Sequence, residues 1–273
     1  MGALRAVTGT AAVAGLAACA FPGIAAARID ALPNVDSQFR KGSTALARSI
    51  ADNPKVVRRA SFSMLPPGGR PAAISTTRLA GFPRDGKSYA ILSTGDARFA
   101  GRPNNAPDFG RGSGGPFVRG ARDVVILRID LRVPAGTSCL SLRFRYLTEE
   151  FPEFVSSPFN DAFIAETGDT TWTTSSNDDP TISAPGNFAQ TADGKLISVN
   201  ASGPTALSSG NAKGTTYDGA TRILRASTPI SRGNRRLYLS IFDQGDRQFD
   251  SAVFLDRLEL DDRSPCESGA VPD

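Results

Sequence analysis

Two neighbouring apolar stretches decide the fold: VVILRIDLRV at residues 124–133 and LSLRFRYL at residues 140–147. In the second stretch Leu142, Phe144 and Tyr146 alternate with two arginines. A period of two residues is typical of a β-strand that buries one face and exposes the other. Both stretches are therefore predicted to be strands of a buried sheet.

The rest of the chain supports a β-protein. Short apolar runs separated by turn residues predict further strands at 56–64, 88–93, 162–165, 196–199, 237–242 and 252–260. Only residues 37–52 show a helical pattern, and Pro54 ends it. Strands do not alternate with helices, and the chain holds 27 Gly and 19 Pro among its 273 residues. We predict an all-β fold, a two-sheet β-sandwich of jelly-roll type with one short N-terminal helix.

The amino terminus resembles an export signal. Residues 1–27 hold one arginine, a small-residue apolar stretch and Ala25-Ala26-Ala27, as in a secretory signal peptide. A lipoprotein signal at 1–18, followed by a lipidated Cys19, is the alternative. The expected location is therefore extracellular, or the cell envelope if Cys19 carries a lipid, and we expect no transmembrane segment in the mature chain. The expected division continues with a linker at 28–42, the sandwich domain at 43–262 and a C-terminal tail at 263–273.

Two cysteines remain after either cleavage, Cys139 and Cys266. In an oxidising compartment they form one candidate disulfide, which would tie the tail to the strand that contains Cys139. Two unpaired thiols are the alternative.

Composition limits the chemistry. The chain contains no His, which removes the usual general base and the commonest zinc ligand. The formal net charge is +4, but the basic residues are scattered, with no dense run or nucleic-acid motif, so we expect no nucleic-acid partner. A non-enzymatic function is favoured.

Two acidic segments nevertheless mark a candidate metal site. Hard cations such as Ca²⁺ take oxygens from carboxylates, amides and backbone carbonyls. If the strand at 252–260 pairs beside the strand at 140–147, the two segments meet at one edge of the sandwich. The predicted Ca²⁺ ligands are Glu149, Glu150, Glu153, Asn160 and Asp161 from the first segment and Asp243, Asp246 and Asp250 from the second.

Other interpretations of the same residues stay open. The carboxylates of Glu149, Glu150 and Asp161 could instead pair with Arg143, Arg145 and other arginines. Alternatively, a secreted carbohydrate-active hydrolase could use Glu150 or Glu153 with Asp250 as its two acids, because such enzymes need no His. An exposed Tyr217 could stack on a sugar with Trp172, although a lone Trp in a sandwich is more often part of the core.

Several motifs occur in the order found in one bacterial family. They are Ala90 to Gly95, Gly101 to Asn105, Phe144 to Phe154, Phe159 to Phe163, Tyr217 to Gly219, Asp243 to Asp246 and Phe249 to Leu255. Over residues 43–262 the chain resembles the choice-of-anchor L domain family. The resemblance implies an exported or surface-displayed β-sandwich that acts in adhesion or ligand binding. The ligand is not identified by the sequence, and we expect a carbohydrate or a protein. Residues 263–273 lack a sorting motif, so we expect free secretion or a lipid on Cys19.

Overall fold

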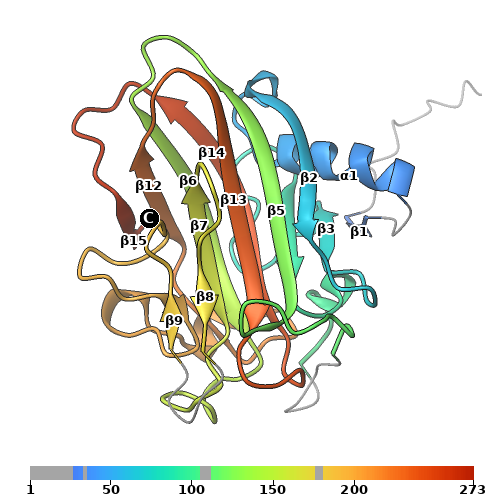
Figure 1. Cartoon of the computed structure of the whole chain (residues 1–273). Helices are drawn as coiled ribbons and strands as arrows, with labels where there is room; N and C mark the ends of the chain where they lie inside the picture. The colour runs from blue at the N-terminus through green and yellow to red at the C-terminus, as the bar shows by residue number, and fades with distance from the viewer. Residues whose placement is uncertain (1–26, 33–35, 105–111, 176–180) are drawn as a thin grey trace, which may run out of the picture.

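The computed structural model describes residues 27–32, 36–104, 112–175 and 181–273, with side chains placed from residue 41 onward in the second of these ranges (Figure 1). The expected export signal, apart from its last residue, and Cys19 lie outside the described residues. Within these ranges no helix is both long and apolar enough to cross a membrane.

Two antiparallel sheets pack face to face, as predicted (Figure 1). The first has the strand order β1 (Ile29–Ala31), β3 (Ala72–Ser75), β4 (Tyr89–Ser93), β14 (Ser251–Asp261), β6 (Cys139–Thr148), β12 (Leu224–Pro229) and β15 (Gly269–Pro272), with β11 (Gly219–Ala220) also paired to β6. The second has the order β10 (Ile197–Ser198), β7 (Ala162–Thr167), β13 (Gly233–Asp243), β5 (Arg122–Val133) and β2 (Val57–Met64). A separate ribbon joins β8 (Thr173–Thr174) to β9 (Ile182–Ser183).

The longer strands alternate between the sheets along the chain. β5, β7 and β13 belong to the second sheet, whereas β6, β12 and β14 belong to the first. The Pro134-Ala135-Gly136 turn therefore carries the chain across the sandwich and does not close a hairpin. This repeated crossing between two antiparallel sheets is the connection pattern of the jelly-roll type.

The core explains why several strands are apolar at every position. Inward side chains such as Leu127 and Phe144 form the layer between the sheets. The outer faces are covered too, because Tyr89 and Phe254 pack under loops on the first sheet and Trp172 and Phe242 on the second. Strands covered on both faces lose the alternation of polar and apolar residues.

The predicted helix closes one side of the sandwich. α1 (Asp36–Ser49) buries Leu46 and Ala47 in the main core beside β2, and Ile50, the residue after the helix, is buried with them. After it, Asn53 caps the short 3-10 helix η1 (Pro54–Val56) by accepting a hydrogen bond from the Lys55 amide. The remaining helices are short: η2 (Ala97–Phe99), η3 (Gly203–Thr205) and α2 (Ser209–Ala212).

Both ends of the described chain belong to the first sheet, which differs from the expected linker and tail. β1 lies in the expected linker and pairs with β3, while β15 lies in the expected tail and pairs with β12. Cys139 and Cys266 form a disulfide with a Cα–Cα distance of 5.5 Å. The predicted pairing is confirmed, and it holds the last segment where β15 can add to the sheet edge.

Candidate metal-binding site

The acidic segments meet at one end of the sandwich, the lower end in Figure 1. Glu149 and Glu150 follow the last residue of β6, and Asp250 precedes the first residue of β14. Thr148 of β6 lies opposite Ser251 of β14, so the predicted pairing of these two strands is confirmed. On the second sheet Asp161 precedes β7 and Asp243 ends β13, each next to a residue of the paired Ala162 and Phe242.

These carboxylates are buried. Glu149, Glu150 and Asp161 are each 1% exposed, and Asp243 is 2% exposed. A buried carboxylate normally has an ion-pair or hydrogen-bond partner, because removing its charge from water is costly. None of these four carboxylates takes part in an ion pair formed by the described residues.

The alternative pairing with arginines is wrong for this cluster. Arg143 pairs with Glu259 at 2.9 Å and with Asp273 at 3.0 Å. Arg145 donates to the backbone carbonyls of Ala80 and Asn211. The physical reason is strand alternation, since these two arginines point to the outer face of the first sheet while the acids lie beyond its end.

One pair of acids forms beside β11. Burial raises the pKa of Glu149 to about 10, and the nearby Asp218 carboxyl adds to the shift. Neither Oε atom of Glu149 accepts a hydrogen bond of ordinary geometry, and the same holds for Oδ2 of Asp218. The other oxygen of Asp218 accepts from Asn104 at 2.7 Å. Two carboxyl groups this close need a proton or a cation between them.

A second pair spans β7 and β13. Burial and the negative charge of Asp161 raise the pKa of Asp243 well above its ordinary range. Burial also raises the pKa of Asp161, to about 7, although hydrogen bonds from the Ser251 hydroxyl and the Gln244 amide oppose the shift. The Asp243 carboxyl lies within hydrogen-bond reach of Asp161. This pair too is held by a shared proton unless a cation replaces it.

Glu150 and Asp250 connect the two pairs. Burial, together with the charges of Asp161 and Asp246, raises the pKa of Glu150 to about 10. The charge of Asp250 acts on both Glu149 and Asp243. The acids therefore form one continuous electrostatic group.

Aromatic residues of the acidic segment hold the surrounding loops together. The ring of Phe151 rests on Gly219, where a Cβ would meet Cγ of Phe151 at 2.4 Å. The ring of Phe159 rests in the same way on Gly245, whose φ is +106°. Each glycine lies next to a carboxylate, Asp218 or Asp246, so this packing brings both loops to the acidic end.

Gly95, which follows β4, is required by close contact with Asp250. A Cβ on Gly95 would lie 1.7 Å from Oδ2 of Asp250. We expect Gly95→Ala to displace that carboxylate and to lower the free energy of unfolding by about 1–3 kcal/mol, as overpacking does. Chemical denaturation measures the change.

The matched control is Gly210→Ala. Gly210 lies in α2, no atom lies within 4 Å of the place that a Cβ would occupy there, and its φ is not positive. Alanine at this position should be neutral or slightly stabilising. Equal stability of the two variants would contradict a tight Gly95–Asp250 contact.

The other predicted ligands lie at the margin. Glu153 is exposed, and Oδ1 of Asn160 accepts from the Asn200 amide at 3.0 Å. Asp246 is half-buried and accepts from the Gln248 amide. Asp218 was not predicted as a site residue, although it falls within one of the family motifs.

The two aromatic residues considered for sugar stacking are both buried. Trp172 is stacked on Phe242 with ring centroids 4.1 Å apart, so the core interpretation is confirmed. Tyr217 was expected to be exposed, and this is wrong: it packs in the cluster on the outer face of the first sheet. Neither ring is available to a ligand.

The described residues include no group of three or more Asp, Glu or Cys side chains placed to hold one metal ion as they stand. They do offer six buried carboxylate or amide oxygens without a hydrogen bond: both from Glu149 and one each from Glu150, Asp218, Asp243 and Gln244. Carboxylate and amide oxygens are the donors that Ca²⁺ prefers. The chemistry of these oxygens suits Ca²⁺, although their present placement does not form a coordination shell.

The site is a group of buried carboxylates at one end of a two-sheet antiparallel sandwich. These features describe a class of protein and do not identify a reaction. The sequence profile of the choice-of-anchor L domain matches residues 87–261, more than half of the chain. The chain belongs to the choice-of-anchor L domain family, as predicted, and membership points to an exported or cell-surface protein.

Comparison with solved structures finds TmCBM61 in complex with beta-1,4-galactotriose, at 6% sequence identity and a TM-score of 0.30. The match covers 74% of this chain and 86% of that chain. No curated protein matches the sequence.

Proposed function

We propose that this chain is a secreted or cell-surface binding and adhesion module, without catalytic activity, whose acidic end is stabilised by Ca²⁺. The observation that carries the proposal is the set of buried carboxylates with oxygens that accept no hydrogen bond. Burial raises the pKa values of Glu149, Glu150 and Asp243, and the like charges of neighbouring carboxylates add to these shifts. A divalent cation would remove that penalty by coordinating the ionised groups.

The residues that would hold the ion are Glu149, Glu150, Asp161, Asp218, Asp243 and Asp250, with Oε1 of Gln244 as a neutral ligand. Ca²⁺ takes six to eight oxygens in flexible geometry, so it tolerates a site of mixed donors from several loops. Bound there, it would link strand ends of both sheets. The ion therefore has a structural role in this proposal.

Thermal unfolding tests the metal site. A ligand that binds only the folded state at a hundredfold excess over its Kd stabilises by about 2.7 kcal/mol. For a domain of this size we expect Tm to rise by about 5–10 °C when millimolar Ca²⁺ replaces chelator. Mg²⁺ at the same concentration is the control, because it demands a near-octahedral shell and should shift Tm less.

An unchanged Tm between chelator and Ca²⁺ would contradict the metal site. The catalytic alternative, a carbohydrate-active hydrolase, predicts hydrolysis of at least one member of a panel of polysaccharides. Turnover that is lost in a folded Asp250→Asn variant would contradict the non-enzymatic proposal.

A further inference from the structure

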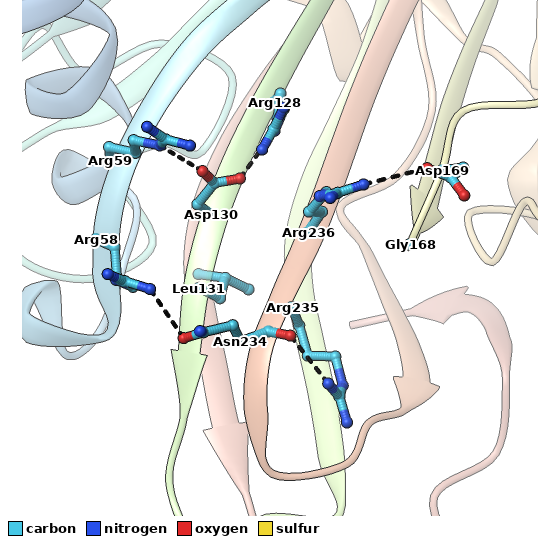
Figure 2. A pocket seen from close by; sticks show the side chains of 10 residues that line it. All are labelled: Arg58, Arg59, Arg128, Asp130, Leu131, Gly168, Asp169, Asn234, Arg235 and Arg236. Atoms are coloured by element: carbon cyan, nitrogen blue, oxygen red, sulfur yellow. Dashed lines mark hydrogen bonds and ion pairs between the residues drawn. The ribbon is translucent and has the colours of Figure 1, made fainter.

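Arginines gather on the outer face of the second sheet, over β2, β5 and β13 (Figure 2). They line two hollows of about 520 Å³ and 560 Å³ that share Arg58 and Asn234. We call this region the arginine surface; its arginines are Arg58, Arg59, Arg128, Arg132, Arg232, Arg235 and Arg236.

A bulge increases the density of charge on this face. The register of β2 against β5 shifts between Val57 and Arg59. Val57 is buried, whereas Arg58 and Arg59 are both exposed. In a regular strand two successive side chains would point to opposite faces. Here the irregularity leaves both guanidinium groups on the solvent side.

The surface carries more positive than negative charge. Asp130 binds Arg59 at 2.6 Å and Arg128 at 2.8 Å, as Figure 2 shows. Asp169 binds Arg236 at 3.4 Å but is itself 80% exposed. These are the carboxylates that line the hollows.

Arg235 donates to the Ser231 hydroxyl and to the backbone carbonyl of Asn234. The three remaining arginines are left to act on a ligand. Arg58 donates to the neutral Oδ1 of Asn234 at 3.0 Å, which holds its guanidinium group over the surface. Arg132 and Arg232 are exposed, and neither forms an ion pair with a described residue. Guanidinium groups match carboxylate, sulfate and phosphate geometry with two parallel hydrogen bonds.

The arginine surface and the acidic end are separate. Both lie on β13, where Arg236 and Asp243 are seven residues apart, about 23 Å in an extended strand. Exposed charges at that distance are largely screened at physiological ionic strength. The arginines therefore do not serve to neutralise the buried acids.

The surroundings select the class of partner. The large hydrophobic side chains exposed in the described residues are Phe117, Val155 and Val271, and none lines the arginine surface. A protein interface would need an apolar centre there. Single-stranded nucleic acid would need aromatic rings for stacking, but Tyr238 of β13 is buried.

We propose that the arginine surface binds an acidic polysaccharide through the carboxylates of its sugar units. This inference rests on the proposed function, since it names the ligand class of the binding module, but not on the metal. Successive carboxylates of one chain could meet Arg58, Arg132 and Arg232 in turn. The polar groups of Asn234 and of the backbone at Gly168 and Gly233 border the same hollows and suit sugar hydroxyls.

Calorimetric titration with short oligogalacturonates tests the proposal, short chains being used because long ones gel with Ca²⁺. The variant is R58Q/R132Q/R232Q. The matched control is R70Q/R78Q/R222Q, which removes three exposed arginines outside the second sheet. We expect the first variant to lose about tenfold or more in affinity and the control to bind as the wild type does. Neutral maltooligosaccharides should not bind.

Salt and chelator complete the design. Affinity for oligogalacturonate should fall as salt rises, because exposed charges are screened. It should be the same with chelator as with Ca²⁺, so a failure of the metal site would leave this result intact. Circular dichroism checks that both triple variants are folded.

Four outcomes would overturn the proposal: no binding of oligogalacturonate at low salt, equal affinity of the wild type and R58Q/R132Q/R232Q, an equal loss in the control variant, or equal binding of the neutral sugar. Duplex DNA is titrated in parallel. Tighter binding of DNA that depends on the same three arginines would assign a nucleic acid partner and overturn it as well.

Discussion

The metal-free protein is expected to lose stability as the pH rises from about 5 to about 7, and Glu150→Gln should remove about 3 kcal/mol of that loss. Carboxylates that form ion pairs with Lys or Arg have the opposite effect, because they lose their stabilising contribution as the pH falls. The difference lies in the buried position of Glu150, where the charged form has no counter-ion among the described residues.

The sign follows from the direction of the pKa shift. Burial and the nearby Asp161 and Asp246 charges raise the pKa of Glu150 to about 10 in the folded protein, from an ordinary value of 4.5. Above pH 4.5 the unfolded chain releases this proton and the folded chain keeps it. The folded state is therefore stabilised fully below that pH, and the stabilisation is lost as the pH rises toward 10. One proton corresponds to about 1.4 kcal/mol per pH unit, which gives the figure of about 3 kcal/mol over two units.

Urea denaturation at several pH values in the presence of chelator measures the effect. Glutamine is neutral throughout, so the Glu150→Gln variant should show a shallower decline and a higher stability at pH 7. Glu153→Gln is the control: it lies three residues away in the same segment but is exposed, and it should follow the wild type. Parallel pH profiles for all three proteins would contradict a buried, uncompensated Glu150.

Saturating Ca²⁺ should reverse this behaviour if the proposed site is correct. The ion binds ionised carboxylates, so the metal-bound wild type should gain stability as the pH rises, because metal binding releases protons. The Glu150→Gln variant should respond less to Ca²⁺ because it has lost a charged ligand. The same substitution thus stabilises one form of the protein and weakens the other.

The fold was largely predictable because its longest strands have strong local patterns. The alternation of Leu142, Phe144 and Tyr146 predicts β6, and the apolar run at the start of β14 predicts another strand. β12 and β15 escaped prediction for a physical reason: their sequences, LRASTP and GAVP, carry little local preference. Pairing to β6 and the disulfide, both long-range contacts, place them in the sheet.

The candidate site was predictable only in part. The first acidic segment, without Lys or Arg, is visible in the sequence. The predicted strand pairing brings the second acidic segment, Asp243 to Asp250, to the same end of the sandwich. Asp218 was not selected because it stands alone in a Ser-, Thr- and Gly-rich region. Its position depends on the short pairing of Gly219 with Thr148, which no local pattern reveals. The exposure of Tyr217 was mispredicted for the same reason, since tertiary packing buries it.

Removal of the disulfide, by the C139A/C266A double substitution, is expected to cost about 5 kcal/mol of unfolding free energy on the chain-entropy account. The two cysteines are 127 residues apart, so the bond closes a long loop in the unfolded chain. Without it the unfolded state gains conformational freedom and is favoured. Alanine is chosen for Cys139 because this residue is fully buried, and alanine adds no polar group that would lack a hydrogen-bond partner there.

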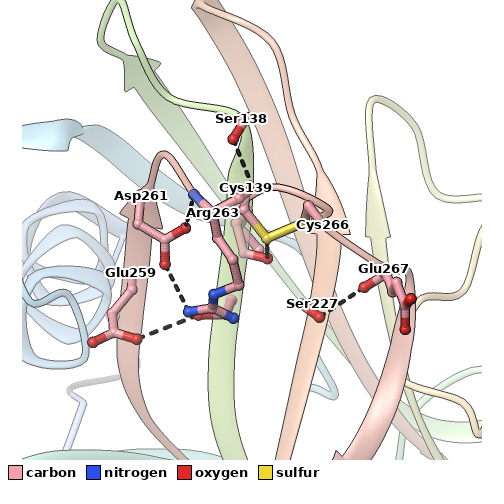
Figure 3. The surroundings of a disulfide bond; sticks show 10 residues. Ser138, Cys139, Ser227, Glu259, Asp261, Arg263, Cys266 and Glu267 are labelled. Carbon is pink, nitrogen blue, oxygen red and sulfur yellow. Dashed lines mark hydrogen bonds and ion pairs between the residues drawn. A yellow bond between two sulfur atoms is a disulfide. The ribbon is translucent and has the colours of Figure 1, made fainter.

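Other contacts should keep β15 near its place when the bond is absent. Ser138 donates to the Arg263 carbonyl and Ser227 to the Glu267 carbonyl, each at 2.8 Å, and Arg263 binds Asp261 (Figure 3). We therefore expect a folded but less stable variant, in which amide hydrogen exchange speeds up first in residues 266–273. Guanidinium denaturation measures the loss, and reductant supplies the control, because it should destabilise the wild type by the same amount and leave the double variant unchanged. A loss well below about 2 kcal/mol would show that the bond restricts the unfolded chain less than its loop length implies. The stabilisation by a disulfide falls short of the chain-entropy value where the unfolded state retains structure.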